Sequence, residues 1–322
     1  MERDRLLPFD PLFRNPHLAT VAGHYWSRPV SEQRWPVSPV VYRTAPDVQV
    51  LVHAQKPLGE ARGAIVLIHG LEGSSGSGYA RSLSHRALEQ GYATHRFNMR
   101  GCGGTEYLST SGYHGGQTGD VLAVLRELRA QSNAPLYLVG FSLGGNVALK
   151  LAGELHNEGG RLLAGVCAVS TPIDLAACVR TLEQPRNFFY QRSFLGRLKE
   201  RIQRRHLQAP ETYTLEHLPK IHTITDFDEY YTSKLFGFGT AANYFRTQSS
   251  NQFLERIRVP TLLLQSQDDP LIPFSVYDLP IFKTNPSLTL VAASHGGHLG
   301  FLSRQRPRFW VDETILGWIE GN

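Results

Sequence analysis

A serine stands in a setting that favours nucleophilic chemistry. The stretch LVGFSLGGN places Ser142 between Gly140 and Gly144, after an apolar run and before a helical pattern. G-x-S-x-G between a strand and a helix is typical of a nucleophile on a sharp turn, where a flanking side chain would meet neighbouring backbone. The predicted chemistry is attack of the Ser142 hydroxyl on a carbonyl carbon, once a base takes its proton. An ordinary serine in a glycine-flanked loop is the alternative.

Two histidines near the end of the chain are candidates for that base. In AASHGGHLGF, His295 lies nearer the end of the apolar run, whereas His298 follows two glycines and precedes LGF. The base is expected in the loop after the last strand, a few residues beyond the strand end. We therefore expect His298 to be the general base and His295 to order its loop by hydrogen bonds to backbone. The opposite assignment stays open.

An acidic pair ends the strand before that one, in LLLQSQDDPLIP. Asp269 precedes a proline, and we expect this turn to present its carboxylate to the histidine while Asp268 hydrogen-bonds the turn. The acid would hold the imidazole tautomer and stabilise the imidazolium. Asp268 remains the alternative acid.

Two backbone amides are predicted to bind the oxyanion. Leu143 begins the helix after the serine, so its amide points from a helix N-terminus. Leu71 follows Gly70 in IHGLEGSSGSGY, after a short apolar run, where a second donor is expected. Reading this glycine-rich loop as a phosphate site is weak, because it lacks Gly-Lys-Ser/Thr and does not fit G-x-G-x-x-G.

The elements that must position these residues alternate between strands and helices. Strands are predicted at 64–70, 92–101, 135–141, 162–170, 260–269 and 288–294, and a strand pair at 38–57. Helices are predicted at 78–91, 119–131, 142–155 and 309–322. This alternation predicts the α/β class: one mostly parallel sheet with helices on both faces.

The domain organisation follows from where the alternation of strands and helices is interrupted. We expect a single domain over 1–322 with an N-terminal arm at about 1–38, because that segment is rich in Pro and aromatic residues. The core would be 39–171 and 251–322. Residues from about 172 to 250 contain no obvious buried strand and are predicted to form a cap over one edge of the sheet.

Two segments of the cap raise further alternatives. Residues 191–206, QRSFLGRLKERIQRRH, contain six Lys or Arg and one acid. We expect a helix with a solvated basic face; contact with anionic lipid or acidic substrates is the alternative. The acids of ITDFDEYYTSKLFGFG are expected to be caps rather than metal ligands. Its aromatic residues either pack the cap or line an acyl pocket: Phe227, Tyr230, Tyr231, Phe236 and Phe238.

The bulk composition bounds the partners. The chain has 322 residues, 41% hydrophobic content and a formal charge of +5, which is weak evidence for nucleic acid. An odd number of cysteines, three, without metal-type spacing predicts reduced thiols in a cytoplasmic protein. No signal peptide or transmembrane segment is expected, and peripheral membrane contact stays open. The oligomeric state is not predictable.

The motifs together resemble the α/β-hydrolase family 4 group, the YheT-like hydrolases. HGLEGSSGSGY, NMRGCGGTE, YHGGQTGD, GFSLGGN, DFDEYYT, QSQDDPLIP and HGGHLGF each resemble family blocks in the expected order. NPHLATV resembles the N-terminal signature, with Ala19 where Gln is usual. The resemblance implies a carboxylic ester hydrolase in which the last histidine of H-G-G-H, here His298, is the base.

The expected function is therefore a serine esterase acting on small esters with an apolar acyl group. It would use the triad Ser142, Asp269 and His298 through an acyl-enzyme, with no metal or cofactor. The alternatives are a lipid or phospholipid hydrolase, an acyltransferase, lyase or peroxidase on the same scaffold, and a catalytically silent binding protein.

Overall fold

The computed structural model describes residues 8–321, and the strands within them form one eight-stranded sheet of order β1-β2-β4-β3-β5-β6-β7-β8. The strands are β1 (Ser38–Ala45), β2 (Val48–Gln55), β3 (Gly63–Ile68), β4 (Tyr92–Phe97), β5 (Leu136–Phe141), β6 (Gly165–Val169), β7 (Thr261–Ser266) and β8 (Leu288–Ala293). β2 pairs antiparallel with β1 and β4, and all other pairs are parallel. The sheet is mostly parallel, as the alternating pattern predicts.

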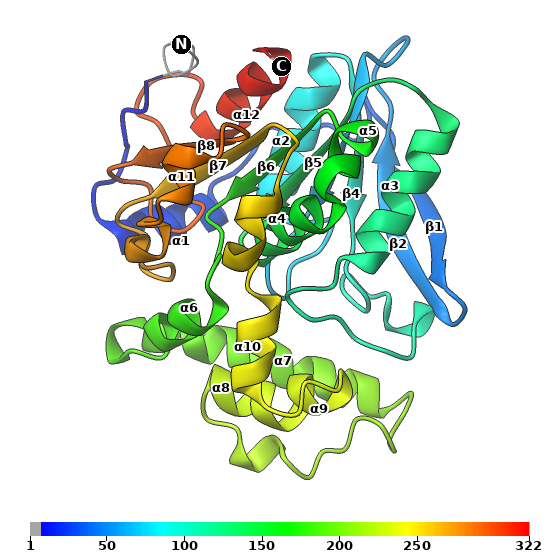
Figure 1. Ribbon diagram of the computed structural model, residues 1–322, viewed down its shortest axis with the longest axis vertical. Helices are drawn as coiled ribbons and strands as arrows, with labels where there is room; N and C mark the ends of the chain where they lie inside the picture. Colours follow the sequence, from blue (N-terminus) through cyan, green and yellow to red (C-terminus); the bar gives the residue numbers. More distant parts are fainter. Residues whose placement is uncertain (1–7, 322) are drawn as a thin grey trace.

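Helices cover both faces of the sheet (Figure 1). They are α1 (Pro16–Tyr25), α2 (Gly78–Glu89), α3 (Gly119–Gln131), α4 (Leu143–Leu155), α5 (Gly159–Leu162), α6 (Leu175–Leu182), α7 (Phe188–His206), α8 (Ile224–Phe227), α9 (Ser233–Leu235), α10 (Ala241–Gln248), α11 (Ile281–Thr284) and α12 (Trp310–Gly321). α3 and α4 contribute to one hydrophobic cluster, and α2 and α12 to the other. Successive residues of β3 alternate between the two clusters, because side chains along a strand point to opposite faces.

The segment between β6 and β7 is helical, and it forms the cap seen below the sheet in Figure 1. It lies over the carboxyl ends of the central strands. Helix α7 buries Leu195, Leu198 and Ile202, whose spacing places them on one face of the helix. This burial attaches the cap to the core.

The basic face of α7 is not simply solvated, contrary to the sequence expectation. Arg205 is 1% exposed and donates to the carbonyl oxygens of Glu106, Ser109 and Ser111 in the core. Arg201 is 7% exposed and pairs with a core carboxylate. Carbonyl groups and a carboxylate of distant loops therefore compensate these buried cations, which the charge pattern of one segment does not reveal.

The arm contains a helix that sequence patterning did not predict. Asn15 caps α1 by accepting from the amides of His17 and Leu18, and Pro16 occupies the first turn. The helix buries small residues, Ala19, Thr20 and Gly23, against the loop that carries His298. The first seven residues of the predicted arm lie outside the described residues.

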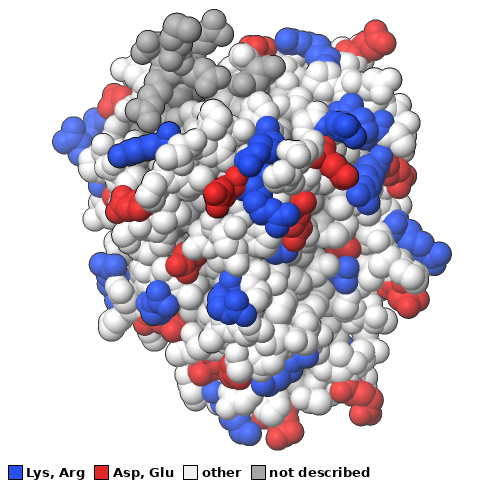
Figure 2. All heavy atoms as spheres, viewed as in Figure 1, with Lys and Arg blue, Asp and Glu red and all other residues white. Residues whose placement is uncertain are grey.

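Charge is mixed over the face shown in Figure 2, where basic and acidic side chains are interspersed. No helix within residues 8–321 is long and apolar enough to cross a lipid bilayer. Over the same residues, no three His, Cys, Asp or Glu side chains gather in a group able to hold a metal ion.

Candidate active site

Ser142 lies on a strained turn between β5 and α4. Its φ is 52° and its ψ is −122°, values that a residue with a side chain rarely adopts. A Cβ on Gly140 would lie 2.6 Å from Gly145 Cα, and one on Gly144 would lie 2.5 Å from His69 O. Both flanking positions therefore require glycine, which is the physical basis of the motif.

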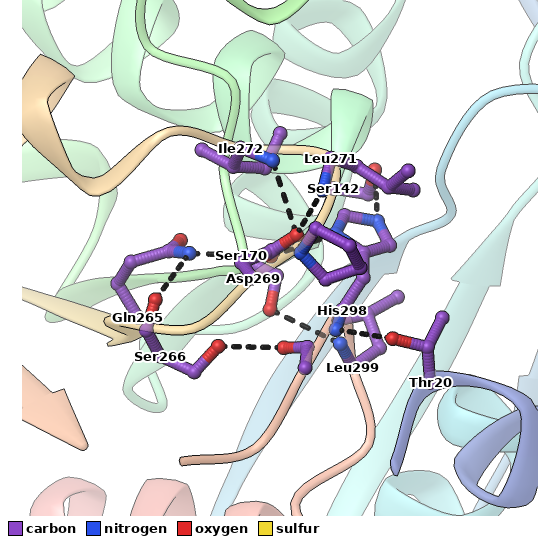
Figure 3. Close-up of polar contacts among 12 residues, drawn as sticks. Thr20, Ser142, Ser170, Gln265, Ser266, Asp269, Leu271, Ile272, His298 and Leu299 are labelled. Atoms are coloured by element: carbon purple, nitrogen blue, oxygen red, sulfur yellow. Dashed lines mark hydrogen bonds and ion pairs between the residues drawn. The ribbon is translucent and has the colours of Figure 1, made fainter. Parts of the chain in front are cut away.

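Three residues from three loops form a continuous hydrogen-bonded chain (Figure 3). His298 Nε2 lies 3.0 Å from Ser142 Oγ, and His298 Nδ1 lies 2.9 Å from Asp269 Oδ2. A carboxylate only accepts, so Nδ1 carries the proton and Nε2 is left to accept from the serine hydroxyl. The arrangement suits removal of the Ser142 proton by His298.

The carboxylate of Asp269 is held by several hydrogen-bond donors. Its Oδ1 accepts from the amides of Leu271 (2.9 Å) and Ile272 (3.1 Å), and its Oδ2 accepts from Gln265 Nε2 at 3.2 Å (Figure 3). The side chain is fully buried in its pair with His298. Three donors besides the imidazole compensate the cost of burying this charge and fix its orientation.

The second histidine–aspartate pair lies outside the hydrogen-bonded chain of Ser142, His298 and Asp269. His295 Nδ1 lies 3.1 Å from Asp268 Oδ2, and Asp268 Oδ1 accepts from the Gly297 amide at 2.9 Å. Side-chain exposure is 37% for His295 and 17% for Asp268. Asp268 thus ties the end of β7 to the loop after β8, and His295 binds a carboxylate rather than the expected backbone group.

The arm supports the loop that carries His298. The His298 amide donates to Thr20 Oγ1 at 2.9 Å, and the Leu299 amide donates to Ser170 Oγ at 3.2 Å (Figure 3). Gly297 has a φ of 55°, and a Cβ there would lie 2.6 Å from Thr20 Oγ1. Thr20 was not predicted from the sequence, and its only signal is that Ala19-Thr20 lies in the motif block NPHLATV.

The two amides predicted to bind the oxyanion are not used in hydrogen bonds within the described residues. Within residues 8–321, neither the Leu71 nor the Leu143 amide donates to a protein atom. Gly70 packs on the nucleophile, because a Cβ there would lie 3.0 Å from Ser142 Cβ. The loop after β3 and the start of α4 therefore both carry unpaired amides beside the serine, as anion stabilisation requires.

His69 fixes the peptide that carries the Leu71 amide. Its Nε2 accepts from the Met99 amide at 3.1 Å, so its Nδ1 carries the proton and donates to Gly70 O at 2.7 Å. In a trans peptide the N–H points away from the C=O, so anchoring Gly70 O sets the direction of the Leu71 N–H. Burial lowers the pKa of His69 to about 4, which keeps the imidazole neutral.

The cap reaches the same loop through a buried ion pair. Arg201 of α7 donates to Glu72, which also accepts from the Tyr113 hydroxyl at 2.9 Å. The Tyr113 hydroxyl in turn accepts from the Glu72 amide at 2.9 Å. Glu72 has a φ of 53°, so these bonds hold a strained residue directly after Leu71.

A cavity of about 380 Å³ opens above Ser142 and His298. α1 and the start of α7 line it with Val21, Tyr25, Phe189, Tyr190 and Phe194. The lining is predominantly apolar, which suits an acyl group.

The five aromatic residues that the sequence suggested for an acyl pocket are not in that lining. Phe227 and Tyr231 are buried within the cap, and Phe227 contacts Arg201 by its ring. For Phe227 and Tyr231 the structure agrees with the packing alternative, and the residues that face Ser142 come from α1 and from the start of α7.

Comparisons with known proteins place the chain in a family. A family described as alpha/beta hydrolase fold matches residues 63–305. The YheT protein of Escherichia coli (strain K12) is 34% identical over 79% of this chain and 76% of its own length. The monoacylglycerol lipase of Saccharomyces cerevisiae and the phospholipase ABHD3 of Homo sapiens are each 30% identical, over 81% and 80% of this chain. The matches span only 60% and 64% of those two longer proteins.

Solved structures agree on the fold. The Pyrococcus furiosus esterase Pf2001 superposes with a TM-score of 0.60 at 16% identity, covering 91% of this chain and 96% of that one. The 2,6-dihydroxy-pseudo-oxynicotine hydrolase superposes with a TM-score of 0.58 at 21% identity, covering 95% and 73%. The fold class predicted from sequence is confirmed. The chain belongs to the alpha/beta hydrolase fold family and, within it, to the YheT-like group.

Proposed function

We propose that the protein is a carboxylic ester hydrolase that acts on esters with an apolar acyl group. The observation that carries the proposal is the hydrogen-bonded chain from Ser142 through His298 to Asp269, beneath an apolar cavity. The names of the yeast lipase and the human phospholipase lend support, since both describe ester cleavage.

In the proposed reaction, Ser142 Oγ attacks the ester carbonyl carbon while His298 Nε2 takes its proton. The Leu71 and Leu143 amides stabilise the negative charge on the carbonyl oxygen, and Asp269 stabilises the imidazolium. The C–O bond to the alcohol then breaks, and His298 returns the proton to the leaving oxygen. Water, deprotonated by His298, attacks the acyl-enzyme and releases the acid and Ser142.

The test is hydrolysis of p-nitrophenyl esters of increasing acyl length by the wild type and by Ser142→Ala. We expect turnover by the wild type that rises and then falls with acyl length, and a loss of about 10³-fold or more in the variant. A fluorophosphonate probe should label the wild type at Ser142 only. Equal turnover by Ser142→Ala would refute the proposal.

A parallel assay with excess methanol or glycerol distinguishes hydrolysis from acyl transfer. Free acid as the dominant product supports the hydrolase. A new ester as the dominant product would point to the acyltransferase alternative, because only the nucleophile admitted to the acyl-enzyme differs.

A further inference from the structure

We propose that exposed apolar side chains around the mouth of the cavity dock this protein on the surface of an anionic lipid layer. The surface, here called the rim, consists of Leu18, Val21 and Tyr25 of α1 and Phe188 and Phe189 of α7. These side chains are between 47% and 82% exposed. Exposed apolar residues that cluster mark an interaction site, whereas isolated ones are ordinary.

Helix α1 is patterned in reverse of a normal surface helix. Its buried residues are small, Ala19, Thr20 and Gly23, and a Cβ on Gly23 would lie 2.6 Å from Gly300 Cα. Its large apolar residues Leu18, Val21 and Tyr25 are spaced three and four apart, so they share the outward face. Burial within this chain explains the small residues, but the outward apolar stripe is left for an external partner.

The two helices that form the rim lie side by side. His17 of α1 stacks on Tyr190 of α7, with ring centroids 5.7 Å apart and the Tyr190 hydroxyl 3.2 Å from His17 Nδ1. Phe188 and Phe189 begin α7 directly before this contact, with ring centroids 5.7 Å apart. The apolar residues of both helices therefore belong to one surface.

The two segments that carry the rim bear only positive charge. Residues 11–31 and 184–199 contain no Asp or Glu. Arg14, Arg186 and Arg192 are exposed in these segments, and Arg197 lies at the cavity. Segments that combine aromatic and aliphatic side chains with arginines and lack carboxylates complement an anionic lipid layer.

The position of the rim favours lipid over a protein partner. Val21, Tyr25 and Phe189 belong to the rim and also line the cavity above Ser142. A protein or a second copy of the chain seated there would cover the entrance, whereas a lipid layer would supply substrate through it. This use of the rim rests on the proposed esterase function, but binding itself requires no turnover.

The test measures co-sedimentation with large vesicles of phosphatidylcholine alone or of equal parts phosphatidylcholine and phosphatidylglycerol. We use Leu18→Gln/Phe188→Gln, because neither side chain lines the cavity. The wild type and Ser142→Ala should bind the anionic vesicles equally. The double variant should lose about tenfold or more in partitioning, because two apolar contacts with the lipid are removed. Its turnover of a short soluble p-nitrophenyl ester should stay unchanged.

The matched control is Tyr107→Gln/Leu207→Gln, which alters two side chains that are 72% and 84% exposed but lie outside the rim. It should bind vesicles like the wild type. Raising the salt from about 0.05 M to about 0.5 M should weaken binding to the anionic vesicles, since screening shortens the range of the arginine charges.

Several outcomes would overturn the proposal. These are absence of wild-type binding, equal binding to both kinds of vesicle, or an equal loss in the control variant. A wild type that sediments as a dimer in solution, with a monomeric Leu18→Gln/Phe188→Gln variant, would assign the rim to self-association instead. If Ser142→Ala binds vesicles but the wild type hydrolyses no ester, the docking surface stands and the proposed function fails.

Discussion

Two histidine–aspartate pairs connect the end of β7 to the loop after β8, and they differ in almost everything but composition. Asp269 is fully buried and His298 nearly so, whereas His295 and Asp268 are partly exposed. His298 contacts Ser142 with its second nitrogen, and Asp268 uses its second oxygen to hold the Gly297 amide. The additional group that each pair contacts, Ser142 in one case and the Gly297 amide in the other, therefore decides what the pair can do.

The largest expected effect comes from replacing each of the two histidines by alanine in a separate variant. His298→Ala should lower kcat by about 10³-fold or more, because no base remains to take the Ser142 proton. His295→Ala should lower it by less than about tenfold, because it removes only a loop contact. Steady-state hydrolysis of a p-nitrophenyl ester measures both. A dead His295→Ala beside an active His298→Ala would reverse the assignment.

The two aspartates sharpen the same contrast. Asp269→Asn should lower kcat by about 10²- to 10⁴-fold, because an amide in place of the carboxylate disfavours the required imidazole tautomer and the imidazolium. Asp268→Asn should change kcat little, since its oxygen can still accept from Gly297. Circular dichroism of both variants checks that they fold. Comparable losses in the two variants would remove the distinction between the pairs.

A third histidine extends the comparison to stability. Burial lowers the pKa of His69 from 6.5 to about 4, so the folded protein keeps it neutral where the unfolded chain takes up a proton. As the pH falls from about 6.5 to 4, this site should reduce the free energy of unfolding by about 3 kcal/mol, with no further loss below.

The variant His69→Gln isolates that contribution. Between pH 6.5 and 4, its free energy of unfolding should depend on pH less steeply than that of the wild type. The difference between the two slopes should correspond to one proton taken up on unfolding. Urea unfolding at several pH values measures both slopes. Identical slopes would mean that His69 is not the neutral buried group described above.

The smallest expected effect concerns the arm. Thr20→Val removes the hydroxyl that accepts from the His298 amide and leaves that donor unpaired. We expect kcat to fall about threefold to tenfold and stability by about 1 kcal/mol. Thr20→Ser keeps the hydroxyl and should behave like the wild type. If Thr20→Ser is as impaired as Thr20→Val, the methyl group rather than the hydrogen bond supports the loop.

Sequence patterning predicted the core well because its signals are local. Buried strands such as β3 and β5 are short apolar runs that end in glycine or before a glycine-flanked serine. α1 escaped prediction because its large apolar residues point outward and its small ones inward, the reverse of the usual signal. The basic face of α7 was predicted to be solvated because the partner of Arg201 is not local. The carboxylate that pairs with Arg201 lies 129 residues away in the sequence.

The sequence by itself determined the α/β fold, the glycine-flanked turn at Ser142 and the loops that carry Asp269 and His298. These follow from side-chain periodicity and from turns that only glycine tolerates. Only the tertiary structure decided which histidine–aspartate pair reaches Ser142, that Thr20 and His69 hold the surrounding backbone, and that α1 and α7 line the cavity. Those features depend on contacts between segments far apart in the chain, and no local pattern encodes the partner.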